Sequence, residues 1–128
     1  MTERHPFEYA VLRIVPRIDR GEFVNGGVLV YCRALDYLGA AVSVDADRLR
    51  ALDPDVDVEH VTAVLESIAV TCGGEADGPA AAEAIGRRFR WLTAPRSTVV
   101  QAGPVHTGLT ADPAAETQRL LGALVLAR

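Results

Sequence analysis

FEYAVLRIVPR at residues 7–17 and FVNGGVLVYC at residues 23–32 decide the fold. In the first stretch Ala10, Leu12 and Ile14 alternate with the residues between them, which is the two-residue period of a β-strand. The second stretch is apolar and has the length of a strand, and a polar turn separates the two. The two stretches therefore predict a pair of consecutive antiparallel strands.

Two glycines, Gly26 and Gly27, interrupt the second predicted strand. Paired glycines inside a strand indicate a β-bulge or the close approach of another backbone. After a turn at residues 33–36, residues 37–44 supply a third strand-like stretch. The first third of the chain therefore predicts a three-stranded antiparallel meander.

Two helices are predicted after the meander, where acidic residues become frequent. Asp45 or Asp47 can cap a short helix, and Asp55 or Asp57 can cap a longer one. Apolar residues of the longer helix recur at spacings of three and four, on one stripe: Val58, Val61, Leu65, Ile68 and Cys72. A Gly-Gly pair at residues 73–74 is expected to end this helix.

The segment after the long helix predicts a short helix and then a strand. Gly78 and Pro79 can start the short helix. Strand character resumes at Arg88, and strand spacing would place Phe89 and Trp91 together on the side that faces the core. This interpretation makes the only tryptophan of the chain a core residue.

The end of the chain predicts two extended segments and a helix. Ser97–Ala102 and Val105–Leu109 are the extended segments, separated by Gly103 and Pro104. Asp112 can cap the final helix, whose first turn holds a proline. The stripe that this helix would bury consists of Leu120, Leu121, Leu124 and Val125. Together the segments predict an α+β fold, mainly an antiparallel sheet packed against two or three helices, in a single domain of residues 1–128.

Composition excludes several classes of protein. All thirteen cationic residues are arginine, so no lysine Schiff base can form. Cys32 and Cys72 are expected to be buried thiols, because no metal-ligand spacing accompanies them. No cofactor and no metal is therefore predicted.

The chain has no signal-peptide stretch and no run of 18 apolar residues, which favours a cytoplasmic protein that does not enter the membrane.

Charge is distributed unevenly along the chain. Residues 34–86 contain eleven acidic residues and two arginines, whereas residues 87–111 contain four arginines and no acidic residue. The net charge of −4 argues against nucleic-acid binding, which depends on neutralising many phosphates. A partner or an anionic ligand is therefore expected at residues 87–111.

Two groups of hydrogen-bond donors in this segment could hold an anionic ligand. Arg96 with Ser97, and His106 with Thr107, have the side chains that commonly bind phosphate. Neither group belongs to a Walker loop or a dinucleotide motif. The alternative is that Ser97 bonds loop amides and that Arg96 pairs with an acid of residues 34–86. Since no nucleophile elbow is present either, no catalytic residue is assigned.

Arg20 and Asn25 form a second candidate group near the first turn. Asn25 lies in an apolar stretch, where a buried amide needs hydrogen-bond partners. We hypothesise that Arg20 and Asn25 converge with Arg96 and His106 on one polar cleft, which would bind a small anionic ligand.

The motifs of this chain resemble a bacterial family of unknown function, DUF3037. The resemblance rests on FEYAVLRIVPR at residues 7–17, RGEFVNGGV at residues 20–28, WLTAPRSTVVQ at residues 91–101 and PVHTGL at residues 104–109. It implies a context beside HipA-like kinase-fold proteins, and hence a protein partner. It implies no activity and no catalytic residue.

Two functions remain open on the sequence. The first is a non-catalytic accessory or interaction module that binds a protein partner. The alternative is an enzyme or binding protein for a phosphorylated or nucleotide-like small molecule, which would use Arg96, Ser97 and His106. A meander also leaves exposed strand edges, so a homodimer through one edge is a further prediction.

Overall fold

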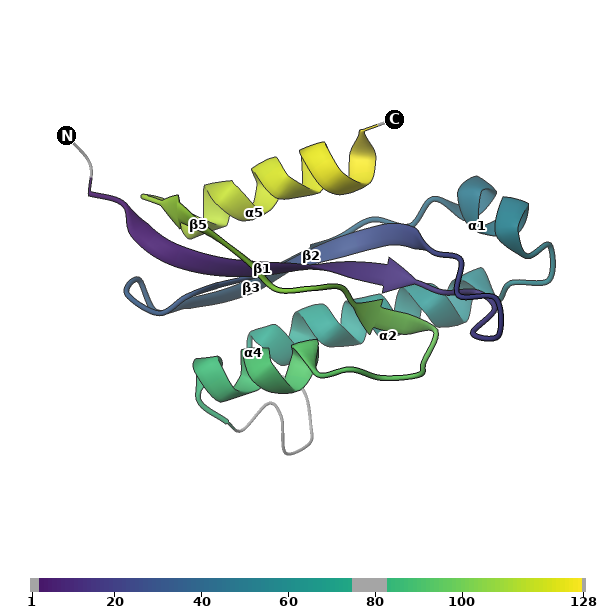
Figure 1. Ribbon diagram of the computed structural model, residues 1–128, viewed down its shortest axis with the longest axis horizontal. Coiled ribbons are helices and arrows are strands. Elements are labelled where there is room, and N and C mark those ends of the chain that lie inside the picture. The colour runs from purple at the N-terminus through teal and green to yellow at the C-terminus, as the bar shows by residue number, and fades with distance from the viewer. Residues whose placement is uncertain (1–2, 75–82, 128) are drawn as a thin grey trace.

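Within residues 3–74 and 83–127, which the structure describes, five strands form one antiparallel sheet with helices on both faces (Figure 1). The structure is a computed structural model. Its strands are β1 (His5–Ile14), β2 (Val24–Cys32), β3 (Tyr37–Val42), β4 (Val100–Ala102) and β5 (His106–Thr110). Its helices are α1 (Ala46–Leu52), α2 (Val58–Cys72), α4 (Ile85–Thr93), α5 (Pro113–Leu121) and the π-helical turn η1 (Gly122–Leu126). The predicted α+β fold is confirmed.

Strand β1 is the centre of the sheet. It pairs with β2, which pairs in turn with β3, so the predicted meander is confirmed. The other side of β1 is shared by β4, which lies opposite residues 12–14, and β5, which lies opposite residues 5–9. Segments near both ends of the chain therefore meet on one strand.

The two glycines of β2 sit at an irregularity in the pairing with β1. Leu12 lies opposite Gly27 but Arg13 lies opposite Asn25, so Gly26 has no opposite residue in this register. A Cβ atom on Gly27 would lie 2.8 Å from the carbonyl oxygen of Ala41 on β3. The predicted bulge and the predicted close approach of a backbone are both confirmed.

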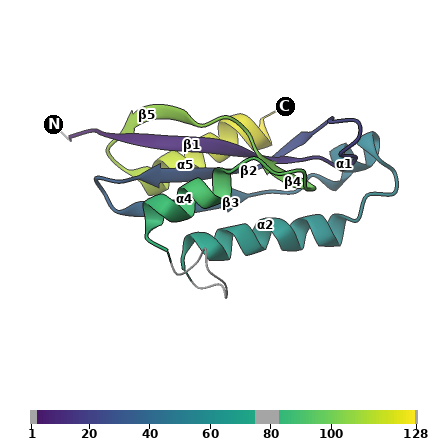
Figure 2. The same ribbon diagram turned by 60° about the horizontal axis from the view of Figure 1, so that its bottom comes forward.

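Each face of the sheet has its own apolar core, and Figure 2 shows α2 and α4 on one side and α5 on the other. Toward α2 and α4, Leu12 and Leu29 pack against Leu65 and Phe89. Toward α5, the core is built from buried residues of β1, β2, β3 and the helix: Phe7, Val28, Val30, Cys32, Ala41 and Leu120. The sheet is thus the middle layer of three.

Aspartates begin three of the helices. Asp45, Asp57 and Asp112 occupy the N-caps of α1, α2 and α5. Each carboxylate accepts a hydrogen bond from the backbone N–H three residues later, at 3.1, 3.0 and 3.1 Å respectively. Such caps satisfy N–H groups that have no partner within the helix. Part of the acidity of residues 34–86 is therefore explained by capping.

The prediction of a strand at Arg88 is wrong, because residues 85–93 form helix α4. Ile85, Phe89 and Leu92 follow one another at spacings of four and three, which places them on one side of a helix. Phe89 is fully buried, whereas Trp91 is 49% exposed, so the two rings do not share a face. The other predicted strand at residues 97–102 is shortened to β4, and the short helix predicted at Gly78-Pro79 lies outside the described residues.

The side chain of Arg88 connects α4 to α2. Its Nη1 donates a hydrogen bond to the carbonyl oxygen of Cys72 at 2.8 Å, and its Nη2 donates to the carbonyl oxygen of Glu83 at 2.6 Å. The carbonyl of Cys72 belongs to the last turn of α2, where carbonyl groups lack helical partners. This contact fixes α4 against the end of α2.

Both cysteines are buried free thiols, as predicted. Burial raises the pKa of Cys72 to about 12, from an ordinary value near 9. We expect neither thiol to react with a disulfide reagent in the native protein at about pH 8, because both side chains are buried and, for Cys72, the raised pKa also keeps the thiol protonated. Both should react after unfolding in urea.

The same pKa predicts the response to alkali. Because the folded-state pKa of Cys72 is raised, its contribution to stability is complete below about pH 9 and is lost as the pH rises toward about 12. Urea unfolding at increasing pH should therefore show a steeper alkaline loss of stability for the native chain than for Cys72→Ala. Equal slopes would contradict this account.

Candidate functional site

Helix α4 turns one side to the core and exposes the other. Trp91, Arg87 and Arg90 lie on the exposed side. Arg96 follows the helix, and its Nη2 donates a hydrogen bond to the carbonyl oxygen of Trp91. The guanidinium carbon of Arg96 lies 4.2 Å from the centre of the Trp91 ring. The indole is therefore accessible to solvent and held on one side by a stacked cation.

Tyr31 of β2 extends this exposed side of α4. Its ring stacks on Phe89, with 5.3 Å between the ring centres. A Cβ atom on Gly86 would lie 2.8 Å from the Tyr31 hydroxyl oxygen, so a glycine in the first turn of α4 lets the phenol lie there. An open hollow of about 570 Å³ results, lined by Tyr31, Gly86, Arg87, Arg90 and Trp91.

A second hollow, of about 400 Å³, adjoins the first because Tyr31 and Arg90 line both. Arg33 and Thr107 also line it. Arg90 forms an ion pair with Glu8 at 2.9 Å, whereas Arg33 forms no ion pair with a described residue. We call Tyr31, Arg33, Arg87, Arg90 and Trp91 the Trp91 surface. It combines two aromatic rings with an excess of positive charge.

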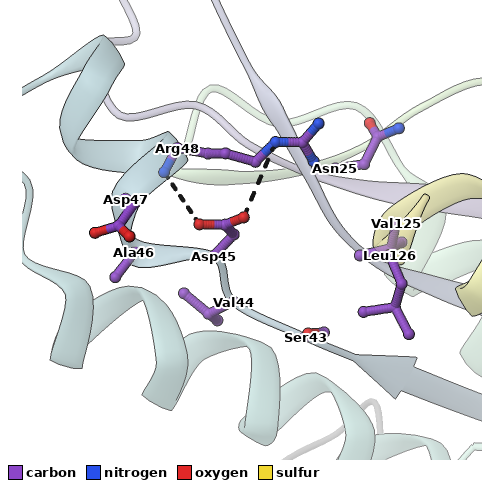
Figure 3. A pocket seen from close by; sticks show the side chains of 9 residues that line it. All are labelled: Asn25, Ser43, Val44, Asp45, Ala46, Asp47, Arg48, Val125 and Leu126. Carbon is purple, nitrogen blue, oxygen red and sulfur yellow. Dashed lines mark hydrogen bonds and ion pairs between the residues drawn. The ribbon is translucent and has the colours of Figure 1, made fainter. Parts of the chain in front are cut away.

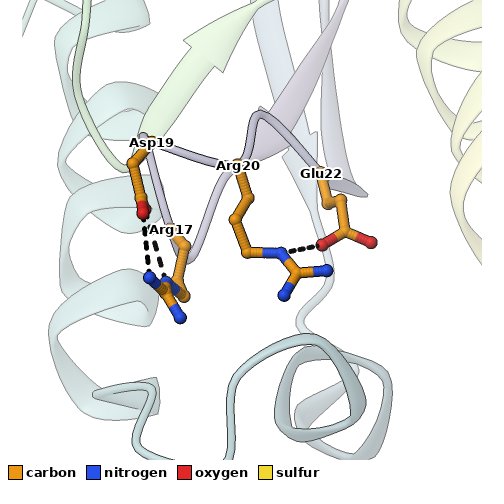
Figure 4. A network of polar contacts seen from close by, with 4 residues as sticks. All are labelled: Arg17, Asp19, Arg20 and Glu22. Carbon is orange, nitrogen blue, oxygen red and sulfur yellow. Dashed lines mark hydrogen bonds and ion pairs between the residues drawn. The ribbon is translucent and has the colours of Figure 1, made fainter.

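Arg20, one of the predicted site residues, lies in the exposed turn between β1 and β2 (Figure 4). Its Nε contacts Glu22 Oε1 at 2.5 Å, and Arg17 pairs with Asp19 at 2.8 Å in the same turn. The hydrogen bond from Arg17 lowers the pKa of Asp19. The two arginines of this turn are therefore neutralised by neighbouring acids.

Asn25 lines a different hollow, of about 330 Å³, between β2, the start of α1 and η1 (Figure 3). Its amide Nδ2 donates a hydrogen bond to the carbonyl oxygen of Leu124 at 3.0 Å. Asp45 and Arg48 lie across the hollow and form an ion pair at 4.0 Å. The half-buried amide of Asn25 thus has a backbone carbonyl near the C-terminus as its hydrogen-bond partner.

The predicted residues of 87–111 lie in separate places. Ser97 is exposed in the loop after α4, and Arg96 lines a hollow beside β4, together with Arg13 of β1. His106 is exposed at the start of β5, where its ring lies 5.2 Å from that of Tyr9. Thr107 lines the second hollow of the Trp91 surface. Arg96 also forms no ion pair with an acid of residues 34–86 in the described part of the chain, in contrast to the alternative considered from the sequence.

Strand register gives the separation of Asn25 from His106. Asn25 lies opposite Arg13, and His106 lies opposite Tyr9 on the other side of β1. Four residues along a strand span about 13 Å, and two strand spacings span about 10 Å. Their backbones are therefore about 16 Å apart by this reckoning. None of the four hollows described, at Asn25, at Trp91, at Thr107 and beside β4, is lined by more than one of Arg20, Asn25, Arg96 and His106.

In the described part of the chain, neither a nucleophile paired with a histidine nor a metal-binding cluster is present. There, no serine or cysteine side chain forms a hydrogen bond with a histidine, which nucleophilic catalysis would require. No group of three or more His, Cys, Asp or Glu residues in that part could hold a metal ion. None of the described helices has the length and hydrophobicity to cross a bilayer.

Sequence reasoning missed Tyr31, Arg13 and the exposure of Trp91. The signal for the exposed side of α4 was present, since the apolar spacing of Ile85, Phe89 and Leu92 leaves Trp91 opposite them. No comparable signal marks Tyr31 or Arg13, because strand pairing decides which residues surround them.

Comparison with known proteins identifies one family. Residues 9–125 match the family described as "Protein of unknown function (DUF3037)". No curated protein and no solved structure matches the chain.

Proposed function

The chain belongs to the DUF3037 family, and we propose that it is a non-catalytic accessory module, a single cytoplasmic domain that binds a partner protein through the Trp91 surface. The family match gives the chain its identity and no activity. The proposal therefore depends on the geometry of the surface.

The observation that carries the proposal is the exposed tryptophan. Trp91 is 49% exposed, adjoins Tyr31 in one hollow and is stacked by Arg96. Tryptophan, tyrosine and arginine are the residues that most often dominate the binding energy of protein interfaces. The stacked guanidinium restrains the indole before binding, so less side-chain entropy is lost on association.

Charge indicates the chemistry of the partner. The Trp91 surface carries Arg33, Arg87 and Arg90; Arg87 pairs with Glu83 and Arg90 with Glu8, whereas Arg33 forms no ion pair with a described residue. An acidic segment on the partner would complement it. We propose a HipA-like kinase-fold protein as the partner, because the family resemblance implies that context, with an acidic segment docked on the Trp91 surface.

Co-purification of the chain with a kinase-fold protein of the HipA type from the same genome tests this proposal. Trp91→Ala is expected to weaken the association by about tenfold or more, as for a central aromatic residue of an interface. Ile18→Ala is the matched control, because Ile18 is 51% exposed but lies in the turn between β1 and β2. Association that survives Trp91→Ala unchanged, or that both variants weaken equally, would reject the Trp91 surface as the docking site.

Charge reversal provides a second arm of the same test. Arg87→Glu combined with Arg96→Glu should weaken the association. The difference in affinity between this variant and the wild type should be smaller at high salt, because salt screens the charge attraction in the wild-type complex. Arg17→Glu is the control, since Arg17 lies in the remote turn. Unchanged association after reversal of the exposed arginines of residues 87–96 would count against an acidic partner.

The alternative, an enzyme or binding protein that takes a phosphorylated or nucleotide-like small molecule at Arg96, Ser97 and His106, receives less support. It would require Arg96, Ser97 and His106 in one pocket. His106, on β5, lies beside the ring of Tyr9 on β1, whereas Arg96 lines a hollow beside β4, so this arrangement favours the interaction module.

A further inference from the structure

A hollow of about 400 Å³ lies where β1 and β4 meet the loop after α4. Arg13 and Arg96 both line it, and no acidic residue does. We propose that this hollow is a binding site for a phosphate monoester, a small organic molecule whose phosphate group is held between Arg13 and Arg96. The inference goes beyond the proposed function, because it needs no protein partner.

Arg13 and Arg96 differ from most arginines of the described chain. Seven arginines form ion pairs with carboxylates. These are Arg17, Arg20, Arg48, Arg50, Arg87, Arg90 and Arg119. Arg88 donates to two carbonyl groups instead. Arg13 and Arg96 pair with no described carboxylate, yet both line one hollow, so this hollow has two arginines and no internal counter-charge.

Aromatic rings hold both guanidinium groups in place. The guanidinium carbon of Arg13 lies 4.3 Å from the centre of the Phe23 ring, and that of Arg96 lies 4.2 Å from the centre of the Trp91 ring. A guanidinium stacked by its face keeps its N–H groups available at its edge, where they can meet a planar pair of oxygens. A Cβ atom on Gly103 would lie 3.1 Å from Arg13 Nε, so the glycine at this position leaves room for the side chain.

The other polar groups of the hollow already have partners. The Gln101 amide donates to the carbonyl oxygen of Thr98 at 2.8 Å, and the Thr93 hydroxyl donates to that of Phe89 at 2.9 Å. The charged donors that remain for a ligand are guanidinium N–H groups: Arg96 uses Nη2 for a hydrogen bond to the Trp91 carbonyl, and Arg13 forms no hydrogen bond through its side chain with a described residue. Two guanidinium groups match the double charge of a phosphate monoester.

The size and lining of the hollow indicate that the ligand has an organic part. Small-molecule pockets usually measure about 300–1,000 Å³, and this hollow falls within that range. Pro95, Pro104 and Val105 contribute an apolar wall. A phosphate group at the two arginines would therefore leave space for a short carbon chain or a sugar against the prolines.

Isothermal titration of the purified full chain with inorganic phosphate and with glycerol 3-phosphate tests the site. We expect glycerol 3-phosphate to bind with a dissociation constant of about 1 mM or below, and more tightly than inorganic phosphate. Arg13→Gln and Arg96→Gln should each weaken binding by about tenfold or more, as expected for loss of a charge-assisted hydrogen bond. Arg20→Gln is the matched control, because its guanidinium already pairs with Glu22.

The absence of binding of either probe up to about 20 mM would overturn the inference. So would an equal loss of affinity in Arg20→Gln and Arg96→Gln, which would indicate attraction by net charge alone. Tighter binding of inorganic phosphate than of glycerol 3-phosphate would overturn the assignment to a monoester. A thermal melt without ligand shows whether each variant is folded. If Arg13→Gln is not folded, Arg13→Lys replaces it in the test, because lysine keeps the positive charge. Undiminished affinity in both Arg13→Lys and Arg96→Gln would then contradict a site built on guanidinium geometry.

Discussion

Phe89→Ala is expected to lower the free energy of unfolding by about 3–5 kcal/mol, the usual cost of removing a buried aromatic ring. The Phe89 side chain is fully buried between the sheet and α2, and its ring stacks on that of Tyr31. Trp91→Ala, two residues further along α4, should cost about 1 kcal/mol or less, because half of the indole is already in water. Urea unfolding followed by circular dichroism measures both values.

The contrast between these two variants distinguishes a helix from a strand at residues 85–93. A strand would place both rings on one face and bury both, so the two substitutions would destabilise the protein by similar amounts. Similar losses would therefore contradict the position of α4 described above.

Gly27→Ala is the second substitution with a large expected effect. Its new methyl group would lie 2.8 Å from the carbonyl oxygen of Ala41 and 3.2 Å from a methyl group of Leu12, so β2 and β3 would have to separate. Overpacking of this kind costs about 1–3 kcal/mol, and more where backbone must move. Thermal unfolding should show a clearly lower midpoint.

Gly122→Ala is the matched control for Gly27→Ala. A Cβ atom on Gly122 would have no neighbour within 4 Å, and the backbone there is helical. Alanine is favoured over glycine in helices by about 0.5–1 kcal/mol, so this variant should be slightly more stable than the wild type. A stability loss in Gly27→Ala no greater than in Gly122→Ala would show that β2 and β3 are not as close as described.

The meander could be predicted because its signals are local. Alternating apolar residues in Phe7–Arg17 and the turns on either side of β2 fix three consecutive strands without reference to the rest of the chain. Helix α4 could not be predicted with the same rules, because Phe89 and Trp91 fit a strand while Ile85, Phe89 and Leu92 fit a helix. The contacts that accompany the helix involve residues distant in the sequence. Arg88 donates a hydrogen bond to the carbonyl at the end of α2, and the Phe89 ring stacks on Tyr31 of β2.

The candidate site shows the same division between local and non-local information. Arg96 was identified from its own segment, which lacks acids. Arg13, which lines the same hollow, is on β1, and it comes to this hollow because β4 pairs with β1 and brings Gln101 opposite Arg13. The register between strands that are distant in the sequence depends on the whole sheet, so no motif within either segment predicts that Arg13 and Arg96 line one hollow.

The proposed function places Trp91 in the interface with a protein partner, and one measurement on the chain detects this contact directly. Trp91 is the only tryptophan, so incorporation of 5-fluorotryptophan gives a single fluorine resonance even when the unlabelled partner contains tryptophans. On addition of a saturating HipA-like kinase-fold partner, we expect this resonance to shift and to lose its sensitivity to solvent, because the indole becomes buried. A complex that forms, as judged by size-exclusion chromatography, while the resonance and its solvent sensitivity stay unchanged would contradict the claim.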